Sequence, residues 1–292
     1  MEICIDAGAS SSKWTSFDLI NGFISGVAPA LTGHIFAEND FLKVRNTLTG
    51  IKNSANNADN LFSVTLGITG LDKKSKISMQ IEGIAKQVFG INKITIISDM
   101  ELASQAVFPE ADGILIYAGT GSIAFHASKS GELIRAGGRG YLIGDEGSGF
   151  SIGRGAIALT AKYWDLGKNP FDYNLCSNIL DFTKSKNWEE LREYVYSGGR
   201  SSVAAIAKVV INCANLGDKY AIDLLKQSGK ELAELCKILN GRTGLNKYVA
   251  MGGIFRSNTH TLESLIEGIG TEVDYLEADI SNLWLEINSK FR

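Results

Sequence analysis

A short turn near the start of the chain carries residues suited to phosphate chemistry. It reads Asp6-Ala7-Gly8-Ala9-Ser10-Ser11-Ser12-Lys13 and follows an apolar segment. Backbone N–H groups and hydroxyls in such a turn can donate to phosphate oxygens, while Asp6 can hold Mg²⁺ through water. The predicted phosphate contacts are Gly8, Ser10, Ser11, Ser12 and Lys13. The same residues also suit a plain tight β-turn, and the P-loop pattern is absent.

A second turn of the same kind lies in the middle of the chain. Gly119, Thr120, Gly121 and Ser122 follow the apolar residues 113–118 and precede another strand-like segment. Residues 5–10 and 116–122 share the order of apolar strand, Gly/Ser/Thr turn and second strand. This short similarity indicates either an internal duplication or chance. Two such turns could together bind a polyphosphate.

Asp99 is the candidate general base. It follows the apolar strand 94–97 and Ser98, and it precedes the helical segment 100–107. Strand carboxyl ends are where α/β sheets place ligand groups, and a carboxylate there can take a proton from an attacking hydroxyl. Asp99 could equally be only the N-cap of the helix, a role that Ser98 could also fill.

Residues 137–149 form the most unusual stretch, with six glycines, two adjacent carboxylates and one arginine. Glycines permit positive φ and close approach of a ligand, so this stretch is a candidate substrate wall that includes Arg139, Gly140 and Asp145. A glycine-rich surface loop is the alternative, in which Asp145 and Glu146 only favour the N-terminus of the next helix. If the stretch is a ligand site, the N-terminus of the helix that follows Glu146 would also stabilise negative charge on the transferring phosphoryl group.

Gly252 and Gly253 close a short apolar strand, 247–251, before another helix. A glycine pair allows a flat ligand such as a nucleobase to lie on the backbone, although a simple turn also explains it.

Strands and helices alternate through both halves of the chain, which predicts an α/β protein with two similar domains. Residues 1–108 should form the N-terminal domain, which we expect the C-terminal helix 278–292 to complete. Residues 109–277 should form the second domain, with a helical insertion within 174–242. Asn21-Gly22 predicts a two-residue hairpin between the second and third strands.

Composition sets broad limits on function. The chain has 292 residues, 45% of them apolar, and a net charge of −3 without a basic block. These values speak against nucleic acid as the main partner. No segment reads as a signal peptide or membrane span, so we expect a cytoplasmic protein without membrane contacts. The four scattered cysteines predict reduced core thiols, and a homodimer is left open.

In this order the motifs resemble those of the sugar-kinase/Hsp70/actin superfamily, in the branch of N-acetylglucosamine kinases and BadF/BadG-type ATPases. Residues 137–149 resemble that branch's G-G-x-G-x-x-x-G-D-E-G-S-[GA] signature, and Ser98-Asp99 resembles the pair that supplies the catalytic base. The resemblance implies two ribonuclease-H-like (actin-like ATPase) domains with ATP and Mg²⁺ in the cleft. It further implies transfer of the γ-phosphoryl group to a hydroxyl of a small carbohydrate. Thr32, Gly33 and His34 match the positions that contact the sugar.

Three departures from the family pattern bear on function. Ala7 and Ala9 replace glycines of the first phosphate motif. Their Cβ atoms limit backbone freedom and crowd the phosphates, which puts nucleotide affinity or metal geometry in doubt. The last helix starts differently, at residues 277–280. Arg139 stands where tryptophan is common, and its fixed donors suit a carboxylate. This favours an anionic substrate such as 2-keto-3-deoxygluconate over neutral or amino sugars, unless Arg139 pairs with Asp145 or Glu146.

Two other classes of protein remain as alternatives. One is an ATPase that activates a dehydratase by electron transfer from a cysteine-bound iron–sulfur cluster, but the cysteine spacing lacks a ligand pattern. The other is a nucleotide-binding structural or sensor module, in which Asp99 would have no catalytic role.

Overall fold

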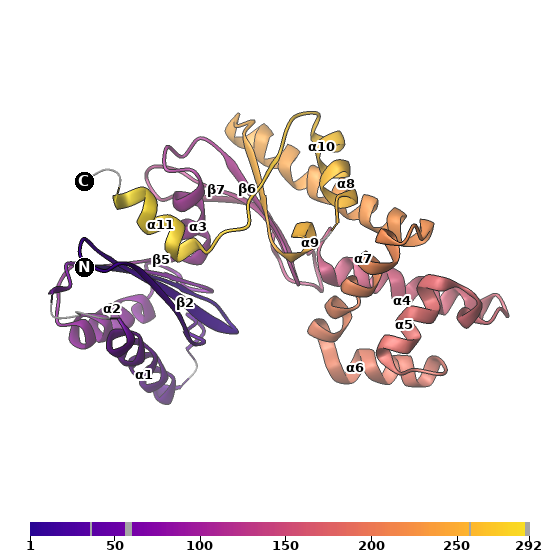
Figure 1. Cartoon of the computed structure of the whole chain (residues 1–292), viewed down its shortest axis with the longest axis horizontal. Coiled ribbons are helices and arrows are strands. Elements are labelled where there is room, and N and C mark those ends of the chain that lie inside the picture. Colours follow the sequence, from indigo (N-terminus) through magenta and orange to yellow (C-terminus); the bar gives the residue numbers. More distant parts are fainter. Residues whose placement is uncertain (36, 56–59, 257, 290–292) are drawn as a thin grey trace. The chain divides into compact units, whose positions relative to one another are not determined.

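The computed structural model describes residues 1–35, 37–55, 60–256 and 258–289, arranged in two compact units. The first unit comprises Met1–Ala111, Ala127–Leu133 and Ala278–Arg292. The second comprises Asp112–His126 and Ile134–Glu277. The C-terminal helix, yellow in Figure 1, thus belongs to the unit formed by the start of the chain.

The first unit is built on a mixed sheet of five strands. An antiparallel meander of three strands is followed by two strands parallel to the first, in the order β3-β2-β1-β4-β5. The strands are β1 (Glu2–Ala7), β2 (Ser11–Asp18), β3 (Gly22–Pro29), β4 (Ser63–Ile68) and β5 (Ile94–Ser98). Strand β4 is buried along its whole length, as expected for a parallel strand with both faces covered.

Four helices cover the two faces of this sheet (Figure 1). They are α1 (Glu38–Ser54), α2 (Lys76–Phe89), α3 (Asp99–Val107) and α11 (Ile280–Ser289). On one side, Ile3 and Ile5 of β1 pack with Leu48 of α1 and Ile81 of α2 in one apolar core. On the other side, α11 packs against α3, β1 and β2.

The second unit repeats the same sheet plan. Its strand order, β10-β9-β6-β7-β8, is that of the first unit read in the opposite direction. The strands are β6 (Ile114–Ala118), β7 (Ser122–Ala127), β8 (Leu133–Gly137), β9 (Tyr248–Met251) and β10 (Asp274–Tyr275). As β1 pairs antiparallel with β2 and parallel with β4, so β6 pairs with β7 and β9. The predicted α/β class with two similar halves is confirmed.

Most of the second unit's remaining residues are helical. The elements are α4 (Gly149–Asp165), the 3₁₀ helix η2 (Pro170–Asp172), α5 (Asn174–Thr183), α6 (Trp188–Ala205), α7 (Ala207–Asn215), α8 (Lys219–Thr243), α9 (Gly253–Arg256) and α10 (His260–Ile269). Their buried faces pack with β6, β7 and β9 in one continuous core. Helix α6 is interrupted at Gly199, where φ is 61° and ψ is −152°.

The hairpin between β2 and β3 differs from the prediction. Asp18 pairs with Gly22, so the loop has three residues rather than two. The Asp18 carboxylate accepts hydrogen bonds from the N–H groups of Ile20 and Asn21, and Gly22 takes a positive φ of 68°. The prediction considered only Asn21-Gly22 and missed this Asx turn, in which a side chain sets the loop length.

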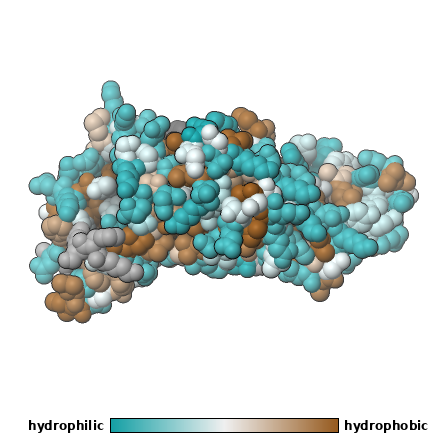
Figure 2. Space-filling model, turned by 90° about the horizontal axis from the view of Figure 1, so that it is seen from above, coloured by the Kyte–Doolittle hydropathy of each residue, from teal (hydrophilic) through white to brown (hydrophobic). Residues whose placement is uncertain are grey.

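The face of the protein in Figure 2 is mainly hydrophilic, with apolar side chains in scattered groups. Within the described residues, no helix combines the length and the apolar composition that a bilayer crossing requires.

Candidate functional site

The first unit gathers candidate groups at the carboxyl edge of its parallel strands. Asp6 pairs in register with Gly67, and Ile68 with Ser98, so β1, β4 and β5 end side by side. Asp99 follows β5 directly. Parallel pairing therefore brings the predicted metal ligand, the predicted base and the first turn to one edge.

The first turn is closed by a hydrogen bond from Gly8 N–H to the Ser11 carbonyl, 3.0 Å. A Cβ on Gly8 would lie 2.9 Å from that carbonyl oxygen, which explains the glycine. Ala7 and Ala9 do not have positive φ, so the backbone accommodates the two alanines that replace family glycines. The departure therefore does not strain the turn.

The hydroxyl groups of this turn differ in availability. Ser10 and Ser11 are exposed, as is Lys13. Ser12 is buried, and its hydroxyl donates to the Pro29 carbonyl at 2.9 Å. Solvent or a ligand can therefore reach the hydroxyls of Ser10 and Ser11. The predicted phosphate contact Ser12 instead uses its hydroxyl to join β2 to β3.

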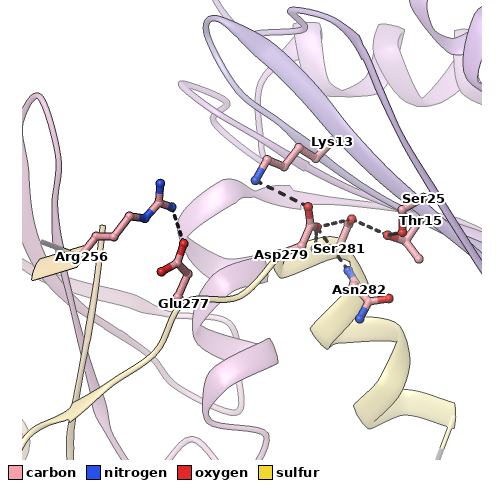
Figure 3. A network of polar contacts seen from close by, with 8 residues as sticks. All are labelled: Lys13, Thr15, Ser25, Arg256, Glu277, Asp279, Ser281 and Asn282. Atoms are coloured by element: carbon pink, nitrogen blue, oxygen red, sulfur yellow. Dashed lines mark hydrogen bonds and ion pairs between the residues drawn. The ribbon is translucent and has the colours of Figure 1, made fainter. Parts of the chain in front are cut away.

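Figure 3 shows how the start of α11 joins this edge. The Lys13 ammonium lies 3.6 Å from the Asp279 carboxylate, which also accepts hydrogen bonds from the N–H and hydroxyl of Ser281. The Ser281 hydroxyl continues to Thr15 and from there to Ser25, each step 2.9 Å. This chain of hydroxyls, buried at Thr15 and Ser281, fixes α11 against β2 and thereby places Asp279 beside Lys13.

Asp6 lies in a strongly acidic environment. The pKa of its carboxyl group is raised from 3.8 to about 6, mainly by burial and then by the negative charges of Asp99 and Asp279, against the opposing effect of Lys13. A bound cation would relieve this repulsion, and oxygen ligands suit Mg²⁺. The described residues contain no group of three or more His, Cys, Asp or Glu placed to hold a metal ion. A single carboxylate is enough for Mg²⁺ that keeps most of its waters, and Asp6 stays the predicted ligand of this kind.

Asp99 is not the cap of its helix. Ser98 is the N-cap of α3, and its hydroxyl accepts a hydrogen bond from Glu101 N–H at 3.0 Å. Asp99 is the first helical residue, half-buried, with one carboxylate oxygen accepting from Met100 N–H. The capping alternative for Asp99 is thus filled by its neighbour, which leaves the Asp99 carboxylate for another role.

Residues 32–34, predicted to contact a sugar, lie at the same edge of the first sheet. Thr32 pairs with Thr69 just beyond β4, and Gly33 N–H donates to the Thr69 carbonyl at 2.9 Å. A Cβ on Gly33 would come within 2.8 Å of the Gly70 carbonyl oxygen, so the two segments approach as only glycine allows. The fold thus brings Thr32, Gly33 and His34 into the unit that holds Asp6 and Asp99.

In the second unit, the second turn is bonded to the start of α4. Gly149 N–H donates to the Gly119 carbonyl at 2.8 Å, and Phe150 N–H to the Thr120 carbonyl at 3.2 Å. The Ser148 hydroxyl caps Ser151 N–H. The first N–H groups of α4 thus have protein partners, and the expectation that this helix end stabilises phosphoryl charge is not supported.

The side chains of this turn differ as those of the first turn do. Thr120 is exposed, whereas the buried Ser122 hydroxyl donates to the Glu146 carbonyl. Thr120 is thus the hydroxyl that a ligand can reach here.

Gly252 lies beside the second turn because β9 pairs parallel with β6, with Met251 opposite Tyr117. Its φ is 108°, and a Cβ would overlap the carbonyl of Ala118. Gly253 has an ordinary φ and open space where a Cβ would point. The two glycines therefore have different roles. The backbone conformation and packing at Gly252 require glycine, whereas Gly253 leaves open space above its Cα.

Side chains of α8 hold the glycine-rich stretch through hydrogen bonds. Glu231 accepts hydrogen bonds from Gly147 N–H at 2.6 Å and from the Ser151 hydroxyl, while the Ser228 hydroxyl donates to the Gly147 carbonyl. Gly147 has a φ of 75°. Sequence reasoning missed Ser228 and Glu231, because nothing local distinguishes them from other polar residues of a long helix.

Asp145 is the buried carboxylate of this stretch. Its Oδ2 forms an ion pair with the Arg200 guanidinium at 2.8 Å, with 3% of the Asp145 side chain exposed. Arg139 is exposed and makes no hydrogen bond or ion pair within the described part of the chain. The alternative that Arg139 pairs with Asp145 or Glu146 is therefore wrong: Arg200, which the sequence did not single out, takes the place beside Asp145.

These features define a protein of the sugar-kinase/Hsp70/actin type, and the comparison with known families agrees. Residues 5–278 match the BadF/BadG/BcrA/BcrD ATPase family. The chain belongs to this family.

Two curated relatives are kinases of N-acetylated amino sugars. The N-acetylmuramic acid/N-acetylglucosamine kinase of Clostridium acetobutylicum is 32% identical over 187 residues, 63% of this chain and 60% of the relative. The N-acetyl-D-glucosamine kinase of Dictyostelium discoideum is 26% identical over 211 residues, 70% of this chain and 64% of the relative. The matched part thus spans less than two thirds of either relative.

Solved structures support the fold over the whole chain. A proposed N-acetylglucosamine kinase from Porphyromonas gingivalis superposes with a TM-score of 0.80 at 18% identity, covering 100% of both chains. A second, from Chromobacterium violaceum, gives 0.74 at 21% identity and 98% of both chains. The expected fold of two actin-like, ribonuclease-H-like units is confirmed.

The contrast between the two glycines after β9 is testable. Gly252→Ala should lower the free energy of unfolding by about 2 kcal/mol or more, because alanine at positive φ is strained and its Cβ meets the Ala118 carbonyl. Gly253→Ala is the matched control and should leave urea unfolding unchanged. Equal stability of the two variants would contradict the geometry.

The raised pKa of Asp6 makes a prediction about pH. The fold favours the protonated form, so the contribution of Asp6 to stability is full below about pH 4 and is lost as pH rises through about 6. Asp6→Asn stays neutral. It should therefore be more stable than the wild type at pH 8, by about 3 kcal/mol at most, with the gap closing towards pH 4.

This gap is measured by urea unfolding in EDTA, because a bound cation would mask it. Asp18→Asn is the control. Hydrogen bonds from Asn21 lower the pKa of Asp18, so the loss of this carboxylate should change the pH dependence of stability in the opposite direction. A pH-independent difference for Asp6→Asn would contradict the assignment.

Proposed function

We propose that the protein is an ATP-dependent carbohydrate kinase. The observation that carries this proposal is Asp99, a half-buried carboxylate at the carboxyl edge of the first sheet that its helix does not need as a cap. In a structural nucleotide-binding module this carboxylate would have no catalytic role. The two kinases among the curated relatives support the same reading.

In the proposed reaction, Asp99 accepts the proton of a substrate hydroxyl as its oxygen attacks the γ-phosphorus of ATP. The new O–P bond forms while the bond from phosphorus to the β-phosphate oxygen breaks, and ADP leaves with that electron pair. Exposed hydroxyls and backbone N–H groups of the two turns, around Ser10, Ser11 and Thr120, would donate to phosphate oxygens. Mg²⁺, when bound, would neutralise phosphate charge, with Asp6 as its carboxylate ligand through water.

The predicted motifs supply candidate residues for the other parts of the ligands. Gly253, with free space at its Cα, would lie against the nucleobase. Thr32, Gly33 and His34 in the first unit, and Arg139, Gly140 and Asp145 in the second, would contact the carbohydrate.

For the substrate we propose an N-acetylated amino sugar, with preference for one that carries a carboxylate, such as N-acetylmuramic acid. The exposed Arg139 guanidinium supports an anionic group, because its fixed donors match a carboxylate. The Clostridium relative is described as acting on N-acetylmuramic acid and N-acetylglucosamine. The sequence-based preference for 2-keto-3-deoxygluconate has no support among these relatives.

The dehydratase-activator alternative needs cysteine thiolates at a surface to hold an iron–sulfur cluster. All four cysteines are buried and free, and burial is the largest cause that raises the pKa of Cys176, Cys213 and Cys236. Buried thiols with raised pKa are poor cluster ligands, which favours the kinase.

Asp99→Asn should test the catalytic role. We expect kcat to fall by about 10²–10⁴-fold, because the amide cannot accept the proton, while the fold and ATP binding are retained. Coupled ADP release measures the rate. Asp72→Asn, an exposed carboxylate on the loop before α2, is the control. A variant with undiminished kcat would favour the structural-module alternative.

A substrate panel should test the sugar. ADP release should be fastest with N-acetylmuramic acid or N-acetylglucosamine, compared with glucose, glucosamine and 2-keto-3-deoxygluconate. Arg139→Ala should reduce kcat/KM for N-acetylmuramic acid about 10–100-fold and leave N-acetylglucosamine unchanged, as expected for loss of one charged hydrogen bond. Arg154→Ala, an exposed arginine of α4, is the control. Selective turnover of a neutral hexose would contradict this substrate.

A further inference from the structure

We propose that Arg200 is a positioning residue: it holds the Asp145 carboxylate in the orientation that binds the carbohydrate and so sets sugar affinity. This inference rests on the proposed function, in which Asp145 contacts the substrate.

The ion pair joins Asp145 and Arg200, and both residues have features that are unfavourable in free energy. Asp145 has a φ of 64°, a left-handed conformation that non-glycine residues rarely adopt. The Arg200 Nε is buried and has no hydrogen-bond partner within the described residues. Backbone strain and an unsatisfied buried donor both destabilise the folded protein, and such features are typical of functional sites.

Helix α6 places Arg200 by a break in its backbone. Gly199, directly before Arg200, has a φ of 61° and a ψ of −152°, which only glycine adopts readily. The last turns of α6 then pack closely on α4, since a Cβ on Gly153 would overlap the Val203 carbonyl. Arg200 is therefore carried by a rigid element rather than by a free loop.

The pair lies directly beside the second phosphate turn. A Cβ on Gly121 would overlap the Arg200 guanidinium and would lie 2.8 Å from Asp145 Oδ2. The guanidinium also lies over the Tyr141 ring, 5.9 Å from its centroid. These contacts confine the Arg200 guanidinium to a position against the Asp145 carboxylate. The charge-assisted hydrogen bond between them then fixes the orientation of that carboxylate.

The inference predicts a specific pattern in a double-mutant cycle. Arg200→Ala should weaken sugar binding about 10–100-fold and change the KM for ATP less than about twofold, because its effect passes through Asp145. In the Asp145→Asn background the same substitution should add less than about twofold. Arg200→Lys, which keeps the charge but loses the planar fork, should be intermediate.

The readouts are titration calorimetry with N-acetylglucosamine, coupled ADP release and thermal unfolding. Arg192→Ala, an exposed arginine on the first part of α6, is the matched control and should behave as wild type. If Arg200→Ala unfolds, Arg200→Lys carries the test alone.

Unchanged sugar affinity in both Arg200 variants, or effects that add fully to those of Asp145→Asn, would overturn the inference. A rise in the KM for ATP with unchanged sugar affinity would overturn it as well, since it would place Arg200 on the phosphates. Sugar binding by the wild type without ADP release would contradict the proposed kinase, yet the calorimetric cycle would still decide the role of Arg200.

Discussion

Parallel strand pairing is the constraint that brings the candidate groups together at the sheet edge of each unit. In the first unit, the register of β1, β4 and β5 brings the ends of three strands together, and with them Asp6, Asp99 and the segment around Thr32. In the second unit, the pairing of β6 with β9 brings the second turn beside Gly252. Carboxyl ends of parallel strands meet at one edge, so residues far apart in sequence become neighbours.

Electrostatics at the first edge depends on the end of the chain. Asp279 enters this edge because α11 packs on β1 and β2 and is held there by the hydroxyls of Ser281 and Thr15 (Figure 3). Its charge adds to that of Asp99 and raises the pKa of Asp6, while it also holds Lys13. The resulting surplus of negative charge suits a cation, and the lysine suits a phosphate.

The shape of the glycine-rich stretch and of the turn at Gly252 in the second unit depends in addition on backbone conformations that few residues adopt. Gly147, Gly252 and Asp145 all have positive φ. Such conformations persist only where the surroundings hold them: α8 binds Gly147 through Glu231 and Ser228, and α6 binds Asp145 through Arg200. Helices that carry no sequence motif thus determine the shape of the motif loop.

The sequence by itself determined the fold class, the duplicated plan and the candidate motifs, because these depend on local patterns: apolar strands, small-residue turns and a glycine-rich stretch. It also pointed to Ser98 or Asp99 as the cap without deciding between them. Only the tertiary structure assigned the cap to Ser98, buried the Ser12 hydroxyl, showed that Ala7 and Ala9 fit their turn, and paired Asp145 with Arg200 rather than Arg139. The Ser98 cap is a local bond, but the sequence offered two neighbouring residues for it. The Ser12–Pro29 and Asp145–Arg200 contacts join residues 17 and 55 positions apart, and the Thr15–Ser281 bond that holds α11 joins residues 266 apart. No local pattern encodes contacts of this kind.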